Sequence, residues 1–76
     1  METNYRELYE AIWQFHKRYI NEVNVSDNFW DSVHKEAIQI SEQFNNHPLI
    51  KALLIAEYDE FARILEEKTE EESKPP

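Results

Sequence analysis

The sequence of 76 residues contains no glycine, whereas an average protein has about 7%. Glycine supplies the positive φ angles of tight β-hairpins and lets a backbone approach bound phosphate closely. Its absence excludes glycine-rich nucleotide-binding loops, Asn-Gly and Asp-Gly hairpins, and the G-x-S-x-G turn of many hydrolases. The turns of this chain must therefore be made by other residues.

The chain also has no cysteine, which excludes disulfides and thiolate zinc sites. A domain of this length buries only about 60% of the surface that its unfolded chain exposes. Small domains without disulfides depend on dense packing or on oligomerisation. The two Trp, four Tyr and four Phe residues supply dense packing. Oligomerisation is the second source of stability that we expect.

Apolar residues recur at spacings of three and four in three segments, which predicts three amphipathic helices. We expect these helices over about residues 4–22, 27–45 and 48–68. Both links between them are short, and short links favour helices that pack as neighbours. The sequence therefore predicts an all-α fold, a three-helix bundle that forms a single domain over residues 1–68.

The predicted helix ends carry recognisable capping residues. Asn4 is the expected N-cap of the first helix, and Ser26 or Asp27 that of the second. The segment 45–48, Asn-Asn-His-Pro, breaks the second periodic pattern. Asn tolerates left-handed backbone geometry, and Pro48 suits the first turn of a new helix. Asparagine is thus expected to adopt the left-handed backbone conformation for which turns often use glycine.

Residues 69–76 differ in composition from the predicted bundle. They contain three Glu, one Lys and two Pro, and no large apolar residue. A segment of this kind cannot bury enough apolar surface to offset the entropy lost on ordering. We expect an acidic, disordered C-terminal tail or a frayed helix end.

The net charge is −8, from 16 acidic and 8 basic residues, and it is uneven. Residues 57–76 hold eight acids and three bases, which is −5 of the total. This excess disfavours binding to nucleic acid, whose phosphates repel it. The simplest interpretation is a solvated surface. The alternative is an acidic inhibitor or nucleic-acid mimic that binds a basic protein surface, with an affinity that falls steeply with salt.

Two polar residues lie in the middle of apolar helix faces: His16 on the first helix and Glu57 on the third. A carboxylate is costly to bury unless it is paired or hydrogen-bonded. We therefore expect a buried polar pair, with Glu57 accepting a hydrogen bond from His16, a Tyr hydroxyl or a Trp indole. The other possibility is that Glu57 bends toward solvent on its long side chain.

Metal binding and catalysis have less support. The candidate ligands are His16, His34, His47, Glu57 and the pair Asp31/His34. Carboxylate-bridged metal bundles use two Glu-x-x-His motifs, whereas this chain has one Asp-x-x-His and no second copy. We expect no metal and no cofactor, and a small metal-binding helical protein stays as an alternative. The serines have no spacing that indicates a catalytic base, and we expect no enzymatic activity.

The third predicted helix has more apolar surface than two partner helices would cover. Seven of the eight residues in 49–56 are apolar, the exception being Lys51. Scattered exposed apolar residues are normal in monomers. The other interpretation, which the small size favours, is a homodimer or docking to an unidentified protein. The residues of this predicted interaction surface are Trp13, Ile38, Ala52, Ile55 and Ala62.

The predicted location is cytoplasmic, without contact to a membrane. The longest uninterrupted apolar run has five residues, 52–56, whereas a membrane-spanning helix needs about 20. The N-terminal residues are charged throughout and have no apolar segment of the kind found in signal peptides.

The run LYEAIWQFHKRY at residues 8–19, followed by DNFW at 27–30, resembles small uncharacterised helical proteins encoded in Gram-positive bacterial genomes and their mobile elements. The resemblance covers residues 4–68. It implies a bacterial cytosolic accessory protein that modulates a protein of the host or the element, and it implies no activity or site residues.

Overall fold

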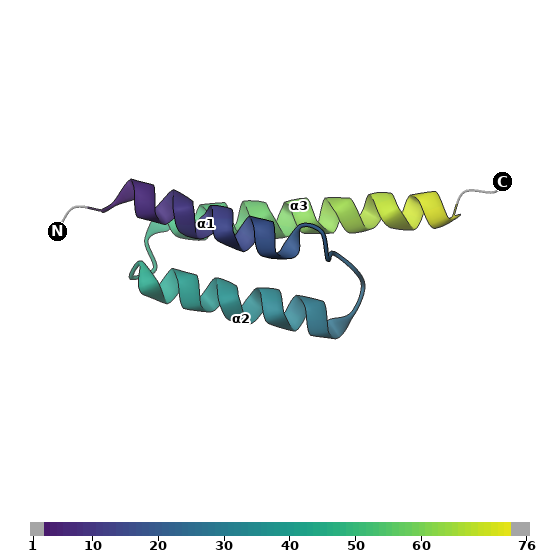
Figure 1. Ribbon diagram of the computed structural model, residues 1–76, viewed down its shortest axis with the longest axis horizontal. Helices are drawn as coiled ribbons and strands as arrows, with labels where there is room; N and C mark the ends of the chain where they lie inside the picture. Colours follow the sequence, from purple (N-terminus) through teal and green to yellow (C-terminus); the bar gives the residue numbers. More distant parts are fainter. Residues whose placement is uncertain (1–2, 74–76) are drawn as a thin grey trace.

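The structure, a computed structural model, describes the backbone of residues 3–73 and the side chains of residues 3–69. Its elements are α1 (Tyr5–Tyr19), α2 (Asp27–Gln43) and α3 (Pro48–Ser73). Helices α1 and α3 run in the same direction, and α2 returns between them in the chain (Figure 1). No strand occurs in the described range. The prediction of an all-α three-helix bundle is confirmed.

The predicted caps account for the starts of the first two helices. The Asn4 side chain accepts a hydrogen bond from the backbone N–H of Glu7 at 3.1 Å. Of the two candidates for α2, Ser26 is the cap, because its hydroxyl accepts from the N–H of Asn28 at 3.1 Å. Such caps satisfy N–H groups that have no partner within the helix.

The turn between α2 and α3 is built by residues that replace glycine. Asn45 and Asn46 adopt positive φ angles of 55° and 57°, in the left-handed region that asparagine tolerates better than most residues. The N–H of Asn46 donates to the Ser41 carbonyl at 2.7 Å, which closes the end of α2. His47 then caps α3, since its Nδ1 accepts from the N–H of Leu49 at 3.0 Å.

Helix α3 continues to Ser73, five residues beyond the predicted end at Lys68. Glu and Lys are good helix formers, and Pro75 is the first residue after Pro48 that would break a helix. The backbone of residues 69–73 is therefore helical, and the last three residues of the predicted tail lie outside the described part of the chain. In Figure 1 this end of α3 projects beyond the other two helices.

The core is a single cluster with aromatic rings at its centre. Phe61 of α3 lies 5.9 Å from Phe15 of α1 and 6.1 Å from Phe29 of α2, measured between ring centroids. Its side chain is fully buried. All three helices therefore meet at Phe61, as expected for a small domain that depends on dense packing. The other buried residues are Leu8, Ile12, Tyr19, Val23, Val33, Ala37, Ile40, Ile50 and Leu54.

Candidate functional site

Two consecutive residues of α3 mark its two flanks. The Glu57 carboxylate lies against His16 of α1, and the Tyr58 hydroxyl lies 3.3 Å from Nδ1 of His34 on α2. Successive side chains of a helix are about 100° apart, so neighbouring residues can serve different helix contacts. We call these flanks the α1 flank and the α2 flank of α3.

On the α1 flank, the structure brings together the two polar residues that interrupt apolar faces. Nδ1 of His16 lies 2.8 Å from Oε2 of Glu57, and the two side chains are 29% and 16% exposed. The pair is thus partly exposed, not buried as expected, and no buried polar side chain occurs among residues 3–69. Water can therefore reach both side chains of the pair.

Trp13 also belongs to the α1 flank. Its ring stacks on His16, with 5.8 Å between ring centroids and an interplanar angle of 15°. The Nζ atom of Lys17 lies 5.5 Å from the centre of the same ring, a cation–π distance. The side chain is 52% exposed, but its ring already contacts His16 and Lys17 of the same helix. The structure therefore separates Trp13 from the rest of the predicted interaction surface.

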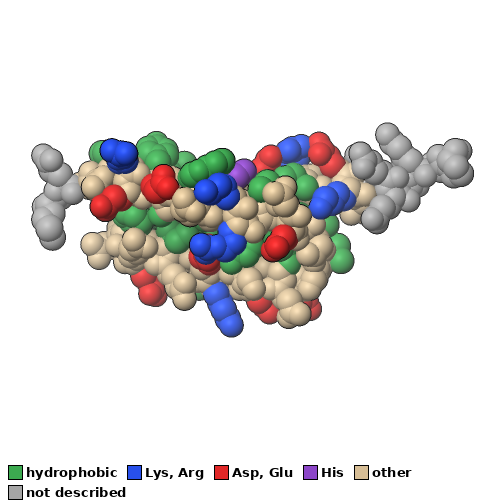
Figure 2. All heavy atoms as spheres, viewed as in Figure 1, with side chains coloured by type: hydrophobic (Ala, Val, Ile, Leu, Met, Phe, Trp, Pro, Cys, Tyr) green, Lys and Arg blue, Asp and Glu red, His purple; other side chains and the backbone are tan. Residues whose placement is uncertain are grey.

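The other exposed aromatic residues of α1 precede Trp13 at helical spacing. Tyr9 and Tyr5 lie about one and two turns before it and are similarly exposed, and the Tyr5 ring meets His47 edge-on at 6.2 Å. On the face seen in Figure 2, hydrophobic side chains gather over the N-terminal half of α1. Acidic and basic side chains alternate farther along, toward the end of α3.

The α2 flank carries a shallow groove of about 240 Å³ whose surface is almost entirely apolar. Ile38 and Ile55 flank it and are 44% and 62% exposed, while Ala37 and Leu54 beneath them are buried. We call this feature the apolar groove. Its residues are His34, Ala37, Ile38, Ser41, Lys51, Leu54, Ile55 and Tyr58.

The structure thus divides the predicted interaction surface. Ile38 and Ile55 meet at the apolar groove. Ala52 and Ala62 are exposed on α3 but do not line the groove. Their positions, three residues before and seven after Ile55, keep them on the same outward face of the helix.

Sequence reasoning did not assign several groove residues to this surface, among them Lys51, Tyr58 and His34. For two of them a signal was available, because Lys51 and Tyr58 are four residues before and three after Ile55. Residues at those spacings are neighbours on a helix surface. For His34 the chain carries no such signal, because its closeness to Tyr58 depends on how α2 packs against α3.

The three histidines lie apart, and each has its own contact. His16 pairs with Glu57, His34 contacts Tyr58, and His47 caps α3. Within the described residues, no three His, Asp or Glu side chains are grouped closely enough to hold a metal ion.

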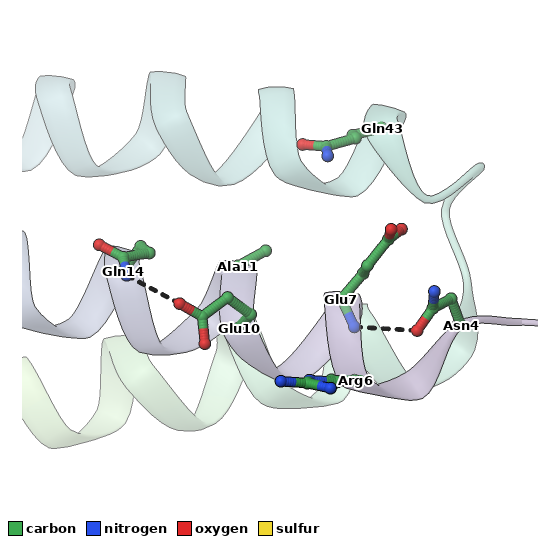
Figure 3. A pocket seen from close by; sticks show the side chains of 7 residues that line it. All are labelled: Asn4, Arg6, Glu7, Glu10, Ala11, Gln14 and Gln43. Atoms are coloured by element: carbon green, nitrogen blue, oxygen red, sulfur yellow. Dashed lines mark hydrogen bonds between the residues drawn. The ribbon is translucent and has the colours of Figure 1, made fainter.

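A surface hollow of about 700 Å³ is open to solvent and lined mainly by polar residues (Figure 3). It is formed by Asn4 and α1 together with Gln43 of α2, and three of its side chains take part in hydrogen bonds at α1. The Asn4 side chain caps the helix, and Nε2 of Gln14 donates to Glu10 at 2.9 Å. Its lining contains no histidine, serine or lysine.

Several acidic side chains are held by bases of the same chain. Arg63 donates to Glu60 at 2.6 and 2.8 Å and to Glu67 at 2.5 Å, and Arg18 pairs with Glu36. The hydrogen bond from Arg63 holds the pKa of the Glu60 carboxyl below its ordinary value. Burial raises the pKa of the Tyr58 phenol at the apolar groove. The described acids of α3 are therefore not a continuous row of free carboxylates.

Among the described residues, no helix combines the length and apolar content that a membrane crossing requires. Comparison of the chain with known protein families, with curated proteins and with solved structures gives no match. The resemblance of residues 8–19 and 27–30 to small Gram-positive helical proteins therefore stays a prediction.

Proposed function

We propose that this protein is a non-enzymatic interaction module that self-associates through the face of α3 around Ile55. The observation that carries this proposal is the apolar groove, whose almost wholly apolar surface is open to solvent between Ile38 and Ile55. A monomer gains nothing from leaving these side chains in water. A second copy of the chain would cover them.

The energetic scale is adequate for a weak, reversible dimer. Complete burial of an isoleucine side chain contributes about 1.5–3 kcal/mol, and a symmetric dimer counts each contact twice. The smallest specific interfaces bury about 1,000 Å² in total, or about 500 Å² per copy. That is less than a tenth of the 5811 Å² surface of the chain. The small size of the domain makes this additional burial valuable.

The Ile55→Glu variant tests the proposal directly. The wild-type protein should be dimeric at high micromolar concentration, and Ile55→Glu should be monomeric, because it places a charge in the contact. Sedimentation or light scattering over a range of concentrations measures both. Ile55 is 62% exposed, and Glu is a good helix former, so the variant should keep its helical circular dichroism.

Trp13→Glu is the matched control, since it adds the same charge at a half-exposed aromatic residue of the α1 flank. This variant should dimerise like the wild type. A wild-type protein that stays monomeric at high micromolar concentration would refute the proposal. Equal dimerisation of Ile55→Glu and the wild type would refute the role of the groove face.

A further inference from the structure

We infer that the two copies pair their α3 helices antiparallel, with Ile55 of each copy next to the two-fold axis. This inference rests on the proposed self-association and adds its geometry. The occupant of the apolar groove is then a second copy of this chain, and the argument for it comes from charges and side-chain sizes around Ile55.

The charge pattern around Ile55 is self-complementary. When two antiparallel helices meet at residue 55, the residue four positions before it on one copy faces the residue four positions after it on the other. These residues are Lys51 and Asp59, both exposed. At about 100° per residue they lie roughly 40° to either side of Ile55. A two-fold axis that runs between the two copies of Ile55, perpendicular to both helices, therefore brings Lys51 of each copy level with Asp59 of the other, which gives two cation–anion pairs per dimer.

Neither charge is paired within the part of the chain that the structure describes. Among the described residues, no ion pair involves the side chain of Lys51 or Asp59. The neighbouring Arg63, by contrast, is engaged with Glu60 and Glu67. Lys51 and Asp59 therefore remain available for a partner, and opposite charges across an interface select orientation and register.

Side-chain size follows the same symmetry. In this register, Ala52 of one copy faces Tyr58 of the other, since they lie three residues before and after Ile55. A small residue opposite a large one allows close approach of two helices. Ala52 is exposed, and Tyr58 lies at the rim of the apolar groove. Ala62 extends this narrow face toward the C-terminal half of the helix.

The distribution of net charge favours the antiparallel orientation over the parallel one. Residues 57–76 hold eight acids and three bases, so a parallel pair would align two strongly negative segments. In the antiparallel pair, the two copies of Glu66 are roughly 33 Å apart along the helix axis, at 1.5 Å rise per residue. This distance is several times the Debye length of about 8 Å at physiological salt.

Charge reversal tests the register. Lys51→Glu and Asp59→Lys each place like charges opposite one another, so each should weaken the dimer about tenfold. The double variant restores two opposite pairs and should dimerise like the wild type. Association is measured by sedimentation at low salt, and circular dichroism verifies that each variant is helical. Lys35→Glu, which changes an exposed lysine of α2 outside the groove, is the control for added negative charge.

Asp59→Lys is the most informative variant, because two explanations predict opposite results. It lowers the net negative charge, so general repulsion predicts a tighter dimer, whereas the Lys51–Asp59 pair predicts a weaker one. A tighter dimer, or a double variant that fails to recover, would overturn the antiparallel register while self-association stands. A wild-type protein that is monomeric at every concentration would overturn the proposed function and this inference together.

Discussion

The two flanks of α3 differ in how the apolar side chains outside the core are covered. Each flank has apolar side chains beyond those that the core buries. On the α1 flank, His16 and Glu57 bond to each other, and Trp13 stacks on His16. On the α2 flank, no ion pair joins the described side chains of α2 and α3, and Ile38 and Ile55 stay exposed. Polar contacts thus occupy part of the α1 flank, whereas the apolar groove of the α2 flank is open to solvent.

The largest effect should come from the residue that both flanks share. Phe61→Ala removes a fully buried ring that packs against Phe15 and Phe29. The free energy of unfolding should fall by about 3–5 kcal/mol, because the variant loses apolar burial and leaves a cavity. Urea denaturation measures the loss. Val25→Ala, at an exposed loop residue, should change the same quantity by less than about 0.5 kcal/mol.

If Phe61→Ala cost no more than Val25→Ala, the three helices would not meet at this ring. The α1 flank and the α2 flank would then not share a core residue.

A smaller effect is expected on the α1 flank alone. Glu57→Leu removes the bond to His16 and makes this flank resemble the α2 flank. Because both side chains are partly exposed, water can replace the hydrogen bond that the His16 imidazole loses. The free energy of unfolding should therefore change by less than about 1 kcal/mol. Thermal or urea denaturation at neutral pH measures it, with Glu57→Gln as the variant that keeps an acceptor. A loss of several kcal/mol would mean that the pair is a main stabilising contact.

The smallest effect concerns the exposed acids beyond both flanks. Because Arg63 lowers the pKa of Glu60 in the folded state, the pair stabilises the protein above the pKa of the unfolded carboxyl. This contribution is lost as pH falls through the folded pKa. In Arg63→Gln, NMR titration should show the Glu60 pKa moving up toward its ordinary value. An unchanged Glu60 titration would show that this surface pair does not form in solution.

Much of the fold could be predicted because helical signals are local. The period of the apolar residues, the Asn4 and Ser26 caps and the break at 45–48 each depend on residues a few positions apart. The same reasoning identified His16 and Glu57 as interruptions of apolar faces. It placed the end of α3 too early, because the change in composition after Lys68 is not a helix stop when Glu and Lys favour helix.

The sequence by itself determined the three helices, their turns without glycine and the uneven charge. Only the tertiary structure decided which neighbour each side of a helix meets. Periodicity gives the angle of a residue around its own axis, but not the rotation of one helix against another. Here that rotation follows from the packing of Phe15, Phe29 and Phe61 at the centre. It directs Glu57 to His16, sets Trp13 apart from Ile38 and Ile55, and leaves the apolar groove between α2 and α3 open.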